Sequence, residues 1–251
     1  MGILDFAIPR ALFVESYFAY KRYLEDPFAK LLKQHPDLLG RGDILDIGAN
    51  IGYTATLFAR SADPDAKVYA FEPEAFNFQI LAKKAKRTSG VVIPIQSAVG
   101  AHEGVVEIWV NESSHADHRV VTPALSESGR ISARASVPMV SIDSFAKAKQ
   151  ITALTFVKID VQGYELEVCE GMENTLQRHP EIRVAVEYMP SAMEELGYEG
   201  PNLLAWFRDR GFVFKRICRD GQLRDGLGEI RGADYVDLLF FREDHPTKFR
   251  V

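Results

Sequence analysis

The sequence has little cysteine and no long apolar run. Its 251 residues include only two cysteines, Cys169 and Cys218, which are too few for a disulfide framework. We expect both to be small buried residues in a reducing compartment. No apolar segment approaches the roughly 20 residues that a membrane-spanning helix needs. Residues 1–10 lack a basic stretch followed by an apolar one, so we expect no signal peptide and a cytoplasmic location.

An excess of positive charge is also absent. The chain has 30 Lys and Arg against 35 Asp and Glu, a net charge of −5. Domains that bind nucleic acid are usually basic or carry a basic stripe, so we expect no nucleic-acid partner. A composition of 47% hydrophobic and 26% charged residues is typical of a globular domain and excludes disorder and coiled coil. The oligomeric state is left open, with a dimer as one option.

Residues 1–42 are predicted to form an appended helical cap. Residues 10–35 have a helical pattern rich in aromatic side chains, and Pro27 must break or restart the helix. Two roles stay open for this segment, because it can pack on the core as a structural cap or act as a lid over a substrate pocket.

From residue 43 onward, short apolar runs alternate with helical patterns. This alternation is typical of βαβ units, which build a parallel sheet with helices on both faces. The last two strands have no helix between them, so we predict that an antiparallel hairpin completes a seven-stranded sheet in one α/β domain, residues 43–251. Strands are expected at 44–47, 68–71, 91–99, 154–159, 182–186, 212–217 and 235–241, an added β-segment at 105–110, and helices at 53–60, 75–87, 164–177 and 202–210.

The end of the first strand predicts a ligand site. Its residues are Asp46-Ile47-Gly48-Ala49-Asn50-Ile51-Gly52, and ligands of parallel sheets bind at the carboxyl ends of strands. Gly48 and Gly52 let the backbone turn tightly and approach a ligand. The spacing is not G-x-G-x-x-G, which disfavours a nicotinamide oxidoreductase. The carboxylate of Asp46 would repel a pyrophosphate but attract an ammonium or sulfonium group; a turn-capping role is the alternative.

The ends of the next two strands extend this site. Glu72 ends the second strand, where a carboxylate can accept hydrogen bonds from both ribose hydroxyls of an adenosine. Together with Asp46 and the missing phosphate cradle, this position predicts S-adenosylmethionine (SAM) as cofactor and S-adenosylhomocysteine (SAH) as product. Ser97, at the end of the third strand, would flank the adenine or serve only as a turn residue.

Two later strands end in carboxylates at the same edge. Asp160 follows the fourth strand and could take a proton from an acceptor hydroxyl or orient it, or it could simply cap the next helix. Glu187 ends the fifth strand and adds a further carboxylate. Lys158, inside the fourth strand, is expected to form a salt bridge or to extend its charged end to solvent rather than to catalyse.

Four segments follow one another along the chain: Leu45 to Gly52, Ala70 to Pro73, Ser97 to Gly100 and Val157 to Glu167. Together they resemble FkbM-type methyltransferases, over roughly residues 43–215. The resemblance implies a Rossmann-like, class I, SAM-dependent enzyme that methylates hydroxyl oxygens. Gln162 stands where many members have Glu, which puts a base role at this position in doubt. Taken together, the predicted cofactor contacts are Asp46, Gly48, Ala49, Asn50, Gly52, Tyr53, Glu72, Pro73, Ser97, Ala98 and Val99.

Residues 111–136 are predicted to form a long, polar substrate loop without secondary structure. His118 is a candidate base or acceptor contact, and Arg119 a candidate ligand for an anionic or sugar acceptor. His115 and His118 have H-x-x-H spacing but no supporting cluster, so we predict no metal site. Solvent exposure of His118 and carboxylate pairing of Arg119 are the alternatives.

The preferred function is therefore methyl transfer from SAM to a hydroxyl of a small molecule, sugar or glycolipid. Asp160 and His118 are the predicted catalytic residues, and Arg119, Gln162 and Glu187 the predicted acceptor contacts. An N-methyltransferase is disfavoured, because the fourth strand is not followed by an Asn/Asp-Pro-Pro-aromatic segment. A non-catalytic binding module on the same scaffold stays open.

Overall fold

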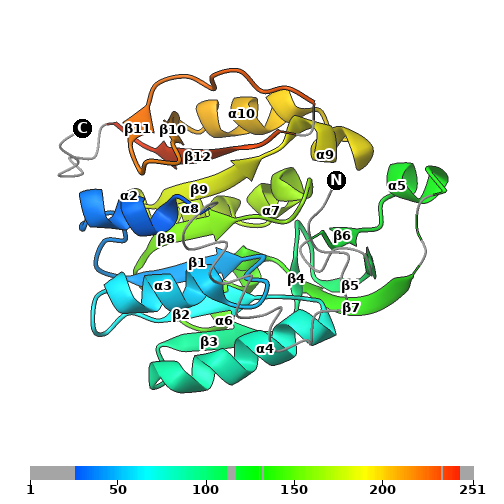
Figure 1. The fold of residues 1–251 in the computed structure, drawn as a ribbon. Helices are drawn as coiled ribbons and strands as arrows, with labels where there is room; N and C mark the ends of the chain where they lie inside the picture. Colours follow the sequence, from blue (N-terminus) through cyan, green and yellow to red (C-terminus); the bar gives the residue numbers. More distant parts are fainter. Residues whose placement is uncertain (1–25, 112–116, 130, 132, 233, 244–251) are drawn as a thin grey trace.

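The computed structural model describes residues 26–111, 117–129, 131, 133–232 and 234–243, and shows an α/β fold (Figure 1). Its main sheet has eight strands in the order β11-β10-β12-β9-β8-β1-β2-β3. These strands are β1 (Asp43–Ile47), β2 (Val68–Phe71), β3 (Val92–Ile95), β8 (Leu154–Ile159), β9 (Arg183–Tyr188), β10 (Val213–Ile217), β11 (Leu223–Arg224) and β12 (Val236–Phe241).

The strand directions confirm a mostly parallel sheet. β3, β2, β1, β8 and β9 pair in parallel, whereas β12 pairs antiparallel with both β9 and β10. The predicted strand count of seven is one too low, because Leu223–Arg224 forms the additional edge strand β11 beside β10. The turn at Asp220-Gly221 therefore joins β10 to β11 rather than β10 to β12.

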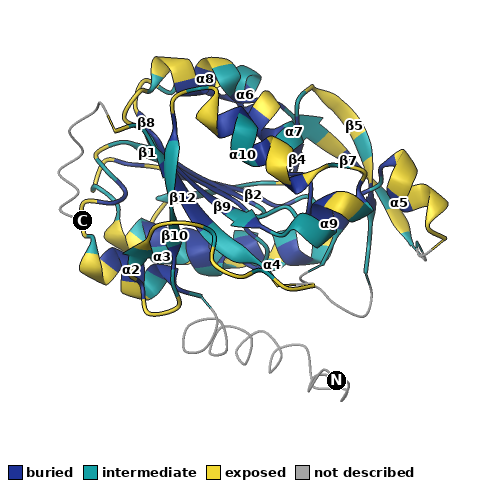
Figure 2. Ribbon diagram, turned by 90° about the horizontal axis from the view of Figure 1, so that it is seen from above, coloured by how far each residue is buried: buried dark blue, intermediate teal, exposed yellow. Residues whose placement is uncertain are grey.

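Helices cover both faces of the main sheet (Figure 2). One face carries α2 (Phe28–Gln34), α3 (Tyr53–Ser61) and α4 (Ala75–Ala85), and the other carries α6 (Ile142–Ala148), α7 (Glu165–Glu170), α8 (Glu173–Arg178) and α10 (Gly200–Arg208). The 3-10 turn η2 (Lys86–Thr88) continues α4, and α9 (Pro190–Glu195) follows β9.

Side chains of β1 alternate between the two cores. Ile44 packs with α2 and α3, whereas Leu45 and Ile47 pack with the helices of the opposite face. Since neighbouring residues of a strand point to opposite faces, Asp46 lies on the side of Ile44, toward α3. This placement buries a carboxylate in a layer of mostly apolar side chains.

A second sheet stands beside the main one, in the order β4-β7-β5-β6. It corrects two predictions. The expected strand 91–99 divides into β3 and β4, because the chain leaves the edge of the main sheet and pairs with β7 instead. The expected structureless loop 111–136 contains β6 and α5 and runs into β7, while residues 112–116 lie outside the described part. The elements are β4 (Ala98–Val99), β5 (Gly104–Trp109), β6 (Arg119–Val120), α5 (Pro123–Glu127) and β7 (Arg134–Val140).

The expected helix 164–177 is two helices, α7 and α8. The Asp143 carboxylate explains the break, because it accepts hydrogen bonds from the backbone N–H groups of Asn174 (3.1 Å) and Thr175 (2.7 Å). A side chain from outside the helix therefore satisfies the free donors of a new helix start.

The described part of the predicted N-terminal cap belongs to the main core. Phe28 and Leu31 of α2 share a cluster with Phe58 of α3, and the rings of Phe28 and Phe58 meet edge to face. Residues 1–25, which hold most of the expected helix 10–35, lie outside the described residues. Within the described residues, no helix has the length and apolar character to cross a membrane.

Candidate active site at the carboxyl ends of the strands

A cavity opens where the strand order reverses. The chain passes from β1 outward through β2 to β3 and later returns to β8 on the other side of β1. In open α/β sheets this switch point is where ligands bind. The cavity has a volume of about 390 Å³, and the ends of β1, β2, β8 and β9 line it together with β4 and β6. Its size is ordinary for a cofactor or small-molecule site.

Gly48 makes the turn out of β1. Its φ of 79° lies in the left-handed region, and a Cβ there would stand 1.8 Å from the Asp160 carbonyl oxygen. Only glycine lets the ends of β1 and β8 meet this closely. The predicted tight turn at this glycine is therefore confirmed.

Asp46 lies behind the cavity wall rather than on it. Its side chain is fully buried, the Thr54 hydroxyl donates to its Oδ2 (2.6 Å), and Lys158 Nζ lies 3.8 Å from its Oδ1. Burial raises the pKa of Asp46, although Lys158 and the Thr54 hydroxyl work against that rise. The structure thus does not place Asp46 for the direct cation contact that the sequence suggested.

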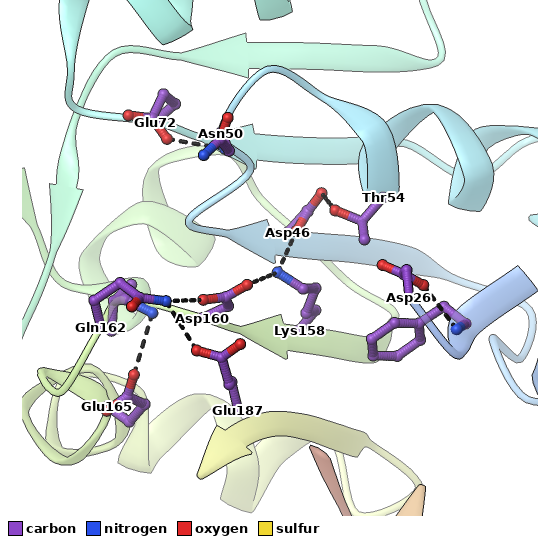
Figure 3. A network of polar contacts seen from close by, with 12 residues as sticks. Asp26, Asp46, Asn50, Thr54, Glu72, Lys158, Asp160, Gln162, Glu165 and Glu187 are labelled. Atoms are coloured by element: carbon purple, nitrogen blue, oxygen red, sulfur yellow. Dashed lines mark hydrogen bonds and ion pairs between the residues drawn. The ribbon is translucent and has the colours of Figure 1, made fainter. Parts of the chain in front are cut away.

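Lys158 starts a chain of polar contacts along the cavity floor (Figure 3). Its Nζ donates to Asp160 Oδ2 (3.0 Å), and Gln162 Nε2 donates to both Asp160 Oδ1 (2.9 Å) and Glu187 Oε2 (2.8 Å). Burial alone would lower the pKa of Lys158, but the carboxylates of Asp160 and Asp46 outweigh it and raise the pKa. Lys158 is therefore a fixed cation, which confirms the predicted salt bridge.

Glu165 holds the loop that presents Gln162. Its Oε1 accepts hydrogen bonds from the backbone N–H groups of Val161 (3.2 Å) and Gly163 (3.1 Å). Gln162 itself has a φ of 56°, a left-handed conformation that a residue with a side chain rarely adopts. Burial raises the pKa of Glu165 to about 7, against the effect of those backbone donors. The strained backbone turns the Gln162 amide toward the two carboxylates.

Glu72 occupies the predicted ribose position at the end of β2. Its Oε2 accepts from the backbone N–H of Asn50 (2.9 Å) and its Oε1 from that of Glu74 (2.9 Å). It lines the cavity while only 5% exposed. Burial raises the pKa of Glu72 to about 8, although both N–H donors oppose the rise. The carboxylate is thus fixed in orientation and poorly solvated.

Most predicted site residues meet at this cavity. Asp46 and Gly52 are the two that are not among the lining residues. The Ser97 hydroxyl is shared between the carbonyl oxygens of Ala98 (2.8 Å) and Pro138 (3.0 Å), so it also ties β4 to β7. The predicted site residues that line the cavity are Gly48, Ala49, Asn50, Tyr53, Glu72, Pro73, Ser97, Ala98, Val99, His118, Arg119, Asp160, Gln162 and Glu187.

The side chains of His118 and Arg119 both form polar contacts with other residues of the protein. His118 Nδ1 accepts from the Asn111 backbone N–H (3.2 Å). Arg119 is buried, donates from Nε to Asp117 (2.6 Å) and pairs through its other arm with Glu195 at the end of α9. The alternative that Arg119 pairs with carboxylates is therefore realised, on the cavity wall. His115 lies outside the described residues.

Sequence reasoning missed several polar side chains of the wall, among them Asp26, Thr54, Asn77 and Tyr235. Asp26 carries a usable signal, because it stands just before Pro27, and its Oδ1 accepts from the Phe28 N–H (2.8 Å) at the start of α2. Asn77 has none, since one polar residue on a helix face does not reveal that it is fully buried.

The fold and the cavity define the class of protein. A sheet of this order, with β12 antiparallel between β9 and β10, is the fold of class I SAM-dependent methyltransferases. Residues 46–214, more than half of the chain, match the model of the Methyltransferase FkbM domain, so the chain belongs to that family.

Individual proteins of known name are similar to the chain. The hexuronic acid methyltransferase AglP of Haloferax volcanii is 30% identical over 137 residues, which are 54% of this chain and 52% of the relative. The chain thus spans about half the length of this curated relative. The FkbM methyltransferase of Methylobacillus flagellatus has a similar structure, with a TM-score of 0.55, 16% identity, and coverage of 89% of this chain and 50% of that one. A SAM-dependent methyltransferase from Aquifex aeolicus is also similar, with a TM-score of 0.46, 14% identity and coverage of 90% and 96%.

Proposed function

We propose that the chain binds SAM in this cavity and transfers its methyl group to a hydroxyl oxygen of a sugar or a similar small molecule. One observation carries the cofactor assignment: the Glu72 carboxylate faces the cavity at the end of β2, beside the turn at Gly48. A carboxylate there suits two ribose hydroxyls. The turn after β1 also lacks the G-x-G-x-x-G spacing of a pyrophosphate cradle. The hexuronic acid named for the relative supports a carbohydrate acceptor.

The position of each residue in the cavity suggests which part of the two substrates it would contact. A bound SAM supplies a methyl carbon that its sulfonium has already activated. Glu72 would accept from the ribose, while Asn50, Ser97 and Val99 would border the adenosine. Asp160, Gln162 and Glu187 would face the acceptor, because they cluster at the ends of β8 and β9. Holding the two reactants in line is worth about 7–11 kcal/mol of the barrier.

Ligand selectivity tests the cofactor. Titration calorimetry with SAM, SAH and NAD should show binding of the two adenosyl compounds and no heat from NAD. The physical reason is that Glu72 suits a ribose, whereas the turn after β1 lacks the glycine spacing that cradles a pyrophosphate. Binding of NAD with no response to SAM or SAH would overturn the proposal.

Methylation of defined sugars tests the reaction. The chain, SAM and either glucuronic acid, glucose or glucosamine would be incubated, and the products analysed by mass spectrometry and NMR. We expect a methyl ether on a hydroxyl-bearing sugar. Methylation confined to the amine of glucosamine would favour nitrogen transfer, and SAM binding without any methylated product would favour a binding module.

A further inference from the structure

We propose that Glu187, rather than Asp160 or His118, is the general base that takes the proton from the acceptor hydroxyl. The inference rests on the proposed O-methyl transfer and names the residue that completes it. Glu187 ends β9, lines the cavity and shares the Gln162 amide with Asp160 (Figure 3). Three side chains therefore compete for the role, and their contacts separate them.

Asp160 is committed to other partners. Lys158 Nζ holds its Oδ2 at 3.0 Å, and Gln162 Nε2 holds its Oδ1 at 2.9 Å. A carboxylate that is paired with a buried cation is a weak base, because protonation would leave the cation without its counterion. Asp160 is therefore placed to orient the acceptor and to keep Lys158 neutralised.

His118 presents the wrong nitrogen. Its Nδ1 accepts a hydrogen bond from the Asn111 N–H, so the neutral ring carries its proton on Nε2. Nε2 is then a donor, and the lone pair that a base needs is already used by the backbone. The Glu74 Oε2 atom lies near that donor, 4.0 Å from Nε2 and beyond hydrogen-bond distance.

Glu187 has a different environment. Gln162 holds its Oε2 at 2.8 Å, and among the described residues no Lys, Arg or His forms an ion pair with it. The charged groups that face it are Asp160 and Lys158 from β8, Asp237 from β12 and Glu165 from α7. Burial raises its pKa well above the usual value, and Asp160 and Asp237 raise it further, against Lys158. A carboxylate of this kind is a stronger base than an ordinary glutamate.

The step is balanced with these groups. The acceptor oxygen forms a bond to the methyl carbon while the C–S bond breaks, and sulfur keeps the bonding pair as the thioether of SAH. The hydroxyl proton passes to the Glu187 oxygen that Gln162 does not hold. Gln162 is a positioning residue, because its neutral amide donates to both carboxylates without adding charge.

The first test is a carboxyl titration. NMR of glutamate-labelled chain, with SAH bound, should show a carboxyl that titrates well above the usual pKa of about 4.3. This signal should be absent in Glu187→Gln, and it should move to lower pH in Asp160→Asn because a like charge is lost. A Glu187 carboxyl in the ordinary range, or one that Asp160→Asn leaves unmoved, would overturn the proposal.

The second test is kinetic, on whichever sugar the chain methylates. Glu187→Gln should lower kcat by about 100-fold or more and leave SAH affinity within about threefold. In the unaltered chain, kcat should fall as pH falls through the pKa of Glu187. In Glu187→Gln, this decrease of kcat should be absent. Glu181→Gln is the matched control, since Glu181 is exposed just before the opposite end of β9.

The outcomes separate the two proposals. Wild-type kcat in Glu187→Gln, with SAH still bound, would overturn the base role and leave the O-methyl transfer standing. If the unaltered chain binds SAH but methylates no sugar, the proposed function fails and the base role falls with it. If Glu187→Gln loses kcat but its kcat still falls as pH is lowered, the role of Glu187 is structural instead.

Discussion

Replacing Glu72 with alanine is expected to weaken SAH binding by roughly 2–4 kcal/mol, because two buried ribose hydroxyls lose a charged acceptor. The carboxylate is already oriented by the N–H groups of Asn50 and Glu74, so little ordering is needed on binding. Calorimetry measures the loss. Glu103→Ala removes an equal charge from an exposed position and should leave the affinity unchanged.

The same carboxyl makes binding depend on pH. Burial raises the pKa of Glu72 to about 8, and donation from the ribose would favour the ionised form and lower that pKa. SAH affinity should therefore rise between about pH 6 and pH 8, by at most about tenfold per unit, with release of a proton. Glu72→Gln should flatten this dependence. An affinity that ignores both pH and the Glu72 substitutions would place the ribose elsewhere.

Replacing Lys158 with methionine is expected to lower the free energy of unfolding by about 3–5 kcal/mol near neutral pH. Lys158 is the cation for fully buried Asp46 and for Asp160, and its loss leaves both carboxylates without compensation. Urea unfolding measures the effect. Lys67→Met, at an exposed position just before β2, should change stability by no more than about 0.5 kcal/mol.

Acid should relieve this destabilisation. The pKa of Asp46 is already raised by burial, and loss of the Lys158 charge would raise it further. At low pH the protonated carboxyl needs no cation, so the difference between Lys158→Met and the unaltered chain should shrink as pH falls. Asp46→Asn added to Lys158→Met should restore part of the stability. Equal loss at all pH values would show that packing of the lysine stem dominates.

The edge of the sheet that carries the site could be predicted from local sequence. Short apolar runs that end in Asp46, Glu72, Asp160 and Glu187 identify strand ends, and parallel strands bring their carboxyl ends together. Most of the expected residues accordingly line one cavity. The class of fold followed from the same alternation of strands and helices.

How far each of these side chains is buried behind the cavity wall could not be predicted in this way. The sequence shows that Asp46 stands at the end of a strand. Only the register between β1 and β8 shows that Asp46 lies opposite Lys158 and that α3 covers both side chains. The register becomes visible only when β1 and β8 pair. Period-two alternation from Ile44 was the available signal, and it puts Asp46 on the covered face.

Very short elements also escaped prediction. β4 and β6 have two residues each, which is too few for any periodic pattern. The five-residue helix α5 had a readable start, because Thr122 caps it through the Leu125 N–H and Pro123 follows at its first position. Because residues 111–136 are rich in polar side chains, their composition gave no sign of β6 and α5.

The position of β12 has a consequence for biosynthesis. β10 and β11 join the described sheet only through β12, although β10 and β11 leave the ribosome first. Until β12 emerges, β9 is an unpaired edge with an apolar face, which is the kind of surface that associates wrongly. Asp237 of β12 is paired in register with Glu187, so the end of the cavity at Glu187 acquires its final charge only when this late strand inserts.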